Sequence, residues 1–419
     1  MTSTPIAEIS RGDLRKLRSP LLASITDVKH LASYNWIEAT TPTIAVPGSP
    51  GLWSPPPTIR RLKTKKEKKR SGLTCINQNA TRRWDSRLEP LFRALYITNP
   101  AFDIRSTDIV TDRNSIRELL SFTNHRPSKK EAKEFTINIE VAKNTVMFSR
   151  AIQEDIQPRD IKRFVERFEK KYTTAQLEDS TGHHRIISYR FGDLNFIVRH
   201  QTNAYVDTGP EAPSSSSSSS GSKAPEKDIP SSVPSSLTRS PSSNSSPPNS
   251  TTPTDSKLTI QQEGNVIPLA STLEIKKRGK RRSPEEKDLI PPLWVSQTPK
   301  LVRAYPVKVR FEAPEVEDMT TAIKLWQGGN QTYLRKLAVL IRWIIDVVKG
   351  SEGSFVIKYE GMGDKVVVSK VEGVGKMLPM DLYSKWDGED DAEVETGVKD
   401  DAEAEKGAEK SVGEAESKV

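Results

Sequence analysis

The sequence predicts an α/β (α+β) fold, with a single domain built on a mixed central β-sheet that helices flank. Three features lead to this prediction. Segments that alternate polar and apolar residues, as strands do, are interleaved with segments that carry a helical apolar stripe. Several of the strand-like segments are joined by short turns. Residues 210–256, rich in Ser and Pro, interrupt the pattern, and we interpret them as a disordered insertion within the domain.

Four segments have the apolar spacing of helices, namely residues 88–97, 112–122, 157–172 and 331–349. The second places Ile116, Leu119 and Leu120 on one stripe. In the third, the residues expected to face inward are Ile161, Phe164, Val165 and Phe168. The fourth is the most regular, and Gly350 is expected to end it because glycine terminates helices at little steric cost.

The segments expected as strands are residues 135–140, 144–149, 184–191, 194–200, 257–262, 266–275, 301–310, 354–359 and 365–371. The first two form one hairpin and the last two form another. We interpret the Pro- and Gly-rich residues 42–57 as a loop anchored by Leu52 and Trp53.

Composition sets the expected domain organisation. Apolar residues make up only 34% of the chain and 29 residues are proline, so part of the chain is expected to be unfolded. We expect residues 1–209 and 257–386 to form two parts of one domain, since a loop tolerates a long insertion at little entropic cost. Residues 387–419 are expected to form a disordered acidic tail.

Charge is distributed unevenly and predicts a polyanionic partner. The tail carries 13 acidic and four basic residues, so residues 1–386 carry about +18 although the whole chain carries +9. A basic body favours nucleic acid, although a merely soluble basic surface would have the same composition. Basic runs at 60–70 and 276–282 suit phosphate contacts or nuclear import.

The sequence also limits the cellular compartments in which the protein is expected. The single cysteine, Cys75, excludes an internal disulfide, and no apolar run approaches membrane-spanning length. The first residues have no signal-peptide pattern. We therefore expect a nuclear or cytoplasmic protein with no membrane partner.

The most informative motif is Glu274-Ile275-Lys276. On a strand, residues two apart point to the same face, so the carboxylate and the ammonium are expected to lie together. There the carboxylate can hold a divalent cation while the ammonium faces a phosphate or an attacking water. This is the chemistry of metal-dependent phosphodiester cleavage.

Five motifs in order resemble those of the decapping exoribonuclease family, whose members remove incomplete or NAD caps from RNA or activate a nuclear exoribonuclease. The resemblance spans about residues 110–310. The matching segments are Arg113 before Leu119-Leu120, Phe168-Glu169 without the family's glycine, Gln201-Thr202-Asn203, Glu274-Ile275-Lys276, and Trp294 followed three residues later by Gln297 at a helix start.

The resemblance implies a role for each residue. Glu169 and Glu274 would hold Mg or Mn, with help from Gln201 and Asn203. Lys276 would orient the attacking water or stabilise developing charge, which makes Glu169, Glu274 and Lys276 the catalytic set. Arg113 and Gln297 would contact phosphates at RNA 5′ ends, and an exoribonuclease is a further implied partner.

One departure argues against full activity. Where the family has Glu-x-Asp, this chain has the amides Gln201 and Asn203. Magnesium and manganese prefer anionic oxygens, so the loss of two charges weakens their attraction to the site. We expect the fold to survive while cleavage is weakened or absent. Asp193 would replace one carboxylate only if the strand register differed.

Plainer interpretations of the same residues remain open. Lys276 also begins the basic run 276–282, Glu169 could be an exposed helix residue, and Arg113 could pair with Asp112 or Glu118. At the level of function, the alternative is a non-catalytic protein that binds nucleic acid or a nuclease partner.

A third interpretation comes from a group label. The overall pattern resembles a divergent fungal group often labelled geranylgeranyl pyrophosphate synthetase. Prenyl synthesis in that family uses two Asp-Asp-x-x-Asp motifs in an all-α fold. Here Asp-Asp pairs occur only at 390–391 and 400–401, without the further Asp, so the residues do not support the label.

Overall fold

The structure is a computed structural model. It describes residues 2–56, 73–75, 78–83, 85–123, 133–151, 156–207, 250–253, 256–277, 286–304, 314–351, 353–361 and 363–387. Most of the predicted insertion 210–256, nearly all of the predicted tail 387–419 and the basic run 60–70 lie outside these residues.

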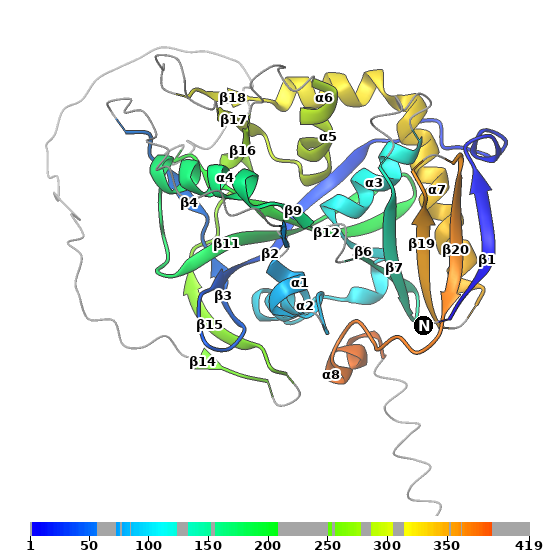
Figure 1. Ribbon diagram of the computed structural model, residues 1–419, viewed down its shortest axis with the longest axis horizontal. Helices are drawn as coiled ribbons and strands as arrows, with labels where there is room; N and C mark the ends of the chain where they lie inside the picture. Colours follow the sequence, from blue (N-terminus) through cyan, green and yellow to red (C-terminus); the bar gives the residue numbers. More distant parts are fainter. Residues whose placement is uncertain are drawn as a thin grey trace, which may run out of the picture.

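A twelve-stranded mixed sheet forms the body of the molecule (Figure 1). Its strands, in spatial order, are β1 (Ser3–Ser10), β20 (Lys365–Val371), β19 (Ser354–Tyr359), β7 (Phe135–Ala142), β8 (Thr145–Arg150), β6 (Ile109–Asp112), β12 (Leu194–Thr202), β11 (Ser180–Phe191), β2 (Ile25–Ile37), β3 (Thr43–Gly48), β15 (Thr259–Gly264) and β14 (Ser250–Thr251). Most neighbours are antiparallel, but β6 runs parallel to both β8 and β12, and β15 runs parallel to β3.

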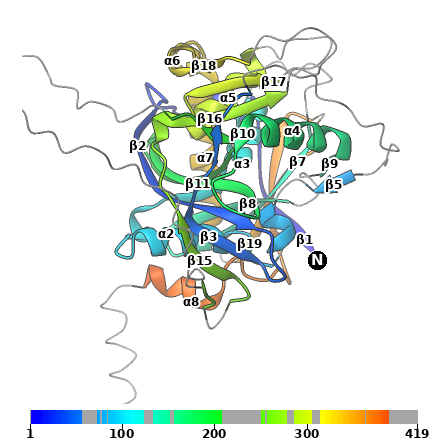
Figure 2. The ribbon, with the colours of Figure 1, turned by 90° about the vertical axis from the view of Figure 1, so that its left-hand side faces the viewer.

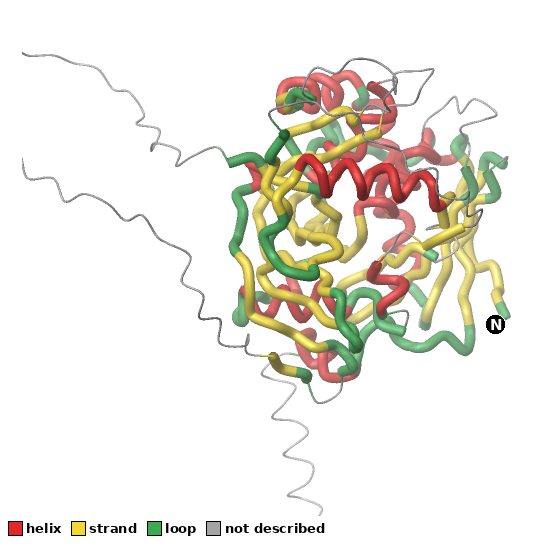
Figure 3. The backbone as a smooth tube through the Cα atoms, turned by 60° about the vertical axis from the view of Figure 1, so that its left-hand side comes forward, coloured by secondary structure: helices red, strands yellow, loops and turns green. Residues whose placement is uncertain are grey.

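A second, six-stranded sheet lies at the top of the view in Figure 2. Its order is β10 (Thr173–Thr174), β4 (Gly51–Trp53), β13 (Ala204–Tyr205), β16 (Thr272–Lys277), β17 (Lys300–Ala304) and β18 (Val316–Asp318). The short strands β5 (Leu73–Cys75) and β9 (Ile156–Pro158) pair separately. Helices surround the strands, as the red and yellow segments of Figure 3 show.

The helices are α1 (Gln78–Arg82), α2 (Glu89–Thr98), α3 (Arg113–Thr123), α4 (Arg159–Tyr172), α5 (Glu286–Ser296), α6 (Thr320–Gly329), α7 (Gln331–Lys349) and α8 (Met380–Tyr383). The predicted fold class is confirmed, because helices flank a mixed sheet. The two sheets also contradict the all-α fold that the prenyl synthetase label requires.

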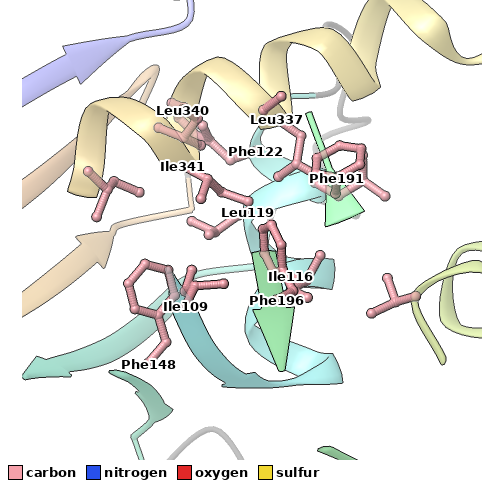
Figure 4. Close-up of a cluster of buried hydrophobic side chains, with 14 of the residues drawn as sticks. Ile109, Ile116, Leu119, Phe122, Phe148, Phe191, Phe196, Leu337, Leu340 and Ile341 are labelled. Atoms are coloured by element: carbon pink, nitrogen blue, oxygen red, sulfur yellow. The ribbon is translucent and has the colours of Figure 1, made fainter. Parts of the chain in front are cut away.

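The main core lies between one face of the large sheet and the helices α3 and α7. Leu337 and Ile341 of α7 meet Leu119 and Phe122 of α3, with Phe196 of β12 beneath them (Figure 4). The opposite face of the sheet packs on α2, and the buried side chains there include Tyr34, Trp36, Leu91, Ile186 and Ile197. Burial of apolar surface on both faces is the main favourable term for such a sheet.

Several predicted elements need correction. Residues 42–57 are not one loop, because they contain β3 and β4, and Trp53 stacks on Tyr172 of α4. The strand predicted at 266–275 begins only at Thr272. The strand predicted at 301–310 is present as β17 up to Ala304, and the rest of that prediction lies outside the described residues. The helix α5 was missed because it contains Pro291 and Pro292, which normally argue against a helix.

Candidate functional site

The predicted site residues lie where the chain passes from one sheet to the other. Strand β12 ends at Thr202 in the large sheet, Asn203 follows, and β13 begins at Ala204 in the small sheet. There Ala204 pairs with Leu273 of β16, the strand that carries Glu274 and Lys276. The neighbouring helix α4 carries Glu169.

Glu274 lies between two cations. Arg113 Nη1 donates to its Oε2 at 3.0 Å, and Lys276 Nζ lies 2.6 Å from its Oε1. Burial alone would raise the pKa of Glu274, but Arg113 and Lys276 hold it at about 2. Glu274 is therefore ionised at neutral pH. The alternative partners proposed for Arg113 pair elsewhere, since Asp112 binds Arg199 and Glu118 binds Arg150.

Glu169 lies close by but in a different environment. Asn203 Nδ2 donates to Glu169 Oε1 at 2.6 Å, while Asn203 Oδ1 accepts from the Ile275 N–H at 2.8 Å. Burial raises the pKa of Glu169 to about 8, and the nearby charge of Glu274 adds to the effect. The Asn203 side chain thus bridges the helix carboxylate and the β16 backbone.

Gln201 and Asn203 both line a cleft of about 560 Å³. The cleft is lined largely by amides and hydroxyls, and its charged residues include Glu38, Arg82, Glu166, Glu169 and Lys170. Gln201 is exposed. Asp193 lies exposed in the turn between β11 and β12, so the register gives it no place among these residues.

Gln297 does not join the other predicted residues. It follows the end of α5 with a positive φ of 51°, and its side-chain amide donates to the Trp294 carbonyl. The helix start implied for this motif is therefore wrong: Trp294 lies in the last turn of α5. The structure brings together Arg113, Glu169, Asn203, Glu274 and Lys276.

These donors do not fit a tightly bound divalent cation. Both oxygens of Glu274 contact cationic side chains, and both ends of the Asn203 amide already form hydrogen bonds. Among the residues that the structure describes, no group of three or more His, Cys, Asp or Glu side chains could hold a metal ion. Within the described part of the chain, Glu169 has no ion pair with a cationic side chain, and one carboxylate with neutral amides is a weak set of ligands for Mg or Mn.

Sequence reasoning missed a second polar group nearby. His183, Arg185 and His200 are buried on β11 and β12, and His183 lines the same cleft. The sequence does contain a signal for this group. On one face of the hairpin, the cross-strand pairs Tyr189–Phe196 and Ile187–Val198 are apolar, and the next pair, Arg185–His200, is polar. No helix of the described part is long and apolar enough to cross a membrane.

A family model described as "Domain of unknown function (DUF8563)" matches residues 9–382. No curated protein matches the sequence significantly. Among solved structures, the chain is similar to Rai1 of S. pombe in complex with 3′-FADP, at 13% identity and a TM-score of 0.54 over 87% of this chain and 99% of that one.

Two further Rai1 structures are similar. Rai1 of Candida albicans, in complex with pU5 and Mn²⁺, is 11% identical, with a TM-score of 0.51 over 92% of this chain and 99% of that one. Rai1 of Scheffersomyces stipitis, with (3′-NADP)⁺ and a calcium ion, is 11% identical, with a TM-score of 0.51 over 88% and 97% of the two chains. At such identities the likeness shows the fold, and at that level it confirms the resemblance to decapping exoribonucleases.

Proposed function

The chain belongs to the DUF8563 family and has the Rai1 fold, and on that premise we propose that it binds RNA 5′ ends in the cleft beside Glu274. The observation that carries the proposal is the pair of cations, Arg113 and Lys276, that meet next to the cleft residues Glu169 and Asn203. Cationic donors at the edge of a polar cleft suit a phosphate group.

Two further observations support an RNA ligand. The solved relatives contain the nucleotide 3′-FADP and the oligonucleotide pU5, so the fold accommodates nucleotides. Residues 1–386 of this chain carry about +18, which attracts a polyanion over distances longer than any contact. The proposed setting is nuclear or cytoplasmic.

We further propose that cleavage is weakened or absent. Mn²⁺ accompanies one relative and a calcium ion another, but here Gln201 and Asn203 are neutral and Glu274 is neutralised by Arg113 and Lys276. Each lost negative charge reduces the attraction for a divalent ion. The loss of these charges should therefore weaken metal-dependent cleavage more than it weakens RNA binding.

RNA binding is tested by fluorescence anisotropy with 5′-phosphorylated oligouridine in EDTA. The full-length chain should bind it more tightly than the 5′-hydroxyl oligomer, and Arg113→Gln should weaken binding about tenfold, the typical effect of losing a charge-assisted hydrogen bond. Arg190→Gln removes the same charge from an exposed position on β11 and should have little effect. An equal loss of RNA affinity in both variants would mean that the effect comes from the overall charge of the protein and not from a contact of Arg113.

Catalysis is tested separately with 5′-monophosphate RNA and NAD-capped RNA in the presence of manganese. We expect no turnover above that of Glu274→Ala. Brisk turnover by the unaltered chain that Glu274→Ala abolishes would overturn the proposed loss of activity and leave the proposed binding intact.

A second candidate function is that of a protein that binds a nuclease partner. It is favoured by three exposed leucines close in sequence, Leu17, Leu21 and Leu22, of which Leu21 is 96% exposed. Exposed apolar side chains that gather together often mark protein contacts. A pull-down with a purified exoribonuclease, compared with the Leu21→Asp chain, tests it.

A further inference from the structure

The outer side of helix α7 is rich in cations. Arg335, Arg342 and Lys349 follow one another at intervals of seven residues, close to two helical turns, so they lie along one stripe of the helix. Lys349 is exposed, and the two arginines are partly exposed. The apolar side of α7, with Leu337 and Ile341, belongs to the main core (Figure 4). The cationic stripe therefore faces away from the core.

The chain between β1 and β2 adds further cations beside α7. Its 3₁₀ turn, Asp13–Arg15, packs against α7, and Gln331 forms hydrogen bonds with both the N–H and the carbonyl of Ala23, each at 3.0 Å. Burial and the charge of Arg15 lower the pKa of Lys336, so these two cations lie close enough to repel one another. We call the following six residues the basic face: Arg15, Arg18, Arg335, Lys336, Arg342 and Lys349.

The described residues leave the basic face without a neutralising carboxylate. Residues 12–18 and α7 together contain seven basic and two acidic residues, a net charge of +5. One of the acids, Asp13, pairs with Lys16 at 2.9 Å. The other is Asp346, and within the described part of the chain no ion pair joins it or another carboxylate to the basic face. Neighbouring cations without a counter-charge repel one another, so this face favours an anionic partner.

The acidic tail, residues 387–419, begins near the end of α7. Tyr383, four residues before the tail, donates through its hydroxyl to Glu140 of β7. In the large sheet Glu140 lies opposite Ser354, the first residue of β19, which follows Lys349 by only five residues. The start of the tail and the last turn of α7 therefore lie at the same end of the sheet.

Length and charge both suit a contact between the tail and the basic face. The tail contains 13 acidic and four basic residues, a net charge of −9. Thirty-two residues follow Asp387. Even wound into a helix they would span about 48 Å, whereas the 19 residues of α7 span about 28 Å. The tail can therefore reach along the whole of α7, at the effective concentration, on the order of millimolar, that a tether gives.

We propose that the acidic tail binds the basic face of its own chain and keeps other polyanions off it. The basic face lies away from the cleft: in Figure 1, α4 beside the cleft is on the left and α7 is on the right. The tail therefore leaves the cleft open, and the inference does not depend on the proposed binding of RNA there. Because the contact joins charges at the surface, salt should weaken it by screening them.

The first test joins carboxylates to neighbouring lysines of the full-length chain with a zero-length carbodiimide cross-linker, and mass spectrometry identifies the joined peptides. We expect the tail to be cross-linked to Lys336 and Lys349 in about 50 mM salt, with a loss of at least about fivefold in about 500 mM salt. The double variant Arg335→Gln, Arg342→Gln keeps both lysines but removes two charges. It should therefore lower these cross-links several-fold in the lower salt.

The matched control for this test is Lys257→Gln with Lys358→Gln, which removes two exposed charges elsewhere. Lys358 points away from α7, because its strand neighbours Ile357 and Tyr359 belong to the main core. The control should keep the cross-links of the parent chain. Tail cross-links that fall mainly on Lys170 of the cleft would overturn the proposal. So would cross-links that mainly join ¹⁵N-labelled to unlabelled chains in a mixture, because the tail would then bind a second copy.

The second test asks whether the tail keeps another polyanion off the basic face. Heparin is the probe, because its binding requires no site for an RNA end. Five glutamates of the tail are changed together to glutamine: Glu393, Glu395, Glu403, Glu405 and Glu409. This variant should elute from immobilised heparin at higher salt than the parent chain. In the Arg335→Gln, Arg342→Gln background the shift should be smaller, because the two sets of charges interact. An equal shift in both backgrounds would mean that the tail acts only through overall charge, and would overturn the proposal.

Discussion

Asn203 is the residue on which the chemistry of the site depends most. Its amide donates to Glu169 and accepts from the Ile275 N–H, so a single side chain connects α4 to β16. An aspartate would have the same shape but could not donate. With an amide at this position, the site lacks one negative charge that could attract a metal ion. In place of the repulsion between two carboxylates, it has a hydrogen bond from Asn203 to Glu169.

This leads to a prediction for Asn203→Asp. The added carboxylate joins Glu169 and Glu274, so we expect the variant to bind Mn²⁺ at least tenfold more tightly than the parent chain, measured by calorimetry. Without metal, it should be less stable to urea, because a third carboxylate repels the other two. The control Gln262→Glu adds a carboxylate at an exposed position on β15, and it should change neither the Mn²⁺ affinity nor the stability to urea. Unchanged Mn²⁺ affinity would show that these side chains do not converge on one ion.

At the scale of elements, two helices, α3 and α4, position side chains of the site. Helix α3 begins at Arg113, directly after β6, and its apolar face packs on α7 (Figure 4). Helix α4 carries Glu169 beside β16 and is packed against Trp53 of β4 by the stacked rings of Phe168 and Tyr172. The position of Arg113 therefore depends on the packing between α3 and α7.

We predict that Leu337→Ala lowers the free energy of urea unfolding by about 2–5 kcal/mol, the usual cost of a cavity at a buried leucine. Leu337 is fully buried on α7 and contacts the core that supports α3. Leu325→Ala on α6 is the control, since Leu325 is 72% exposed and its truncation should change stability by less than about 0.5 kcal/mol. Equal effects of the two substitutions would contradict the packing described here.

For the whole molecule, buried imidazoles predict how stability depends on pH. Burial, with nearby arginine charge, lowers the pKa of His200 to about 3 and that of His30 to about 4. Their unfolded pKa is about 6.5, so between these values the unfolded chain binds more protons than the folded one. Stability is therefore fully present above pH 6.5 and is lost as the pH falls toward 3.

This is checked by urea unfolding between pH 7 and pH 4. Each buried histidine should contribute a slope of up to about 1.4 kcal/mol per pH unit below pH 6.5. His200→Gln removes one such group and should make the decline shallower, whereas Lys349→Gln, on the exposed end of α7, should not. An identical decline in His200→Gln would mean that His200 does not contribute.

The sequence by itself determined the elements whose patterns are local. Helix α7 has the predicted bounds, and so do the strands β19 and β20, because apolar period and turn length are properties of neighbouring residues. The order of the motifs was enough to indicate the fold. It did not require any knowledge of which side chains meet.

Only the tertiary structure decided the composition of the site. Contacts between residues far apart in the chain set it: Glu274 between Arg113 and Lys276, Asn203 on Glu169, and Gln297 turned away at the end of α5. The burial of His183, Arg185 and His200 was equally hidden, because a buried histidine and an exposed one look alike in sequence. Burial and partner choice arise from packing across the two sheets, which local residue patterns do not encode.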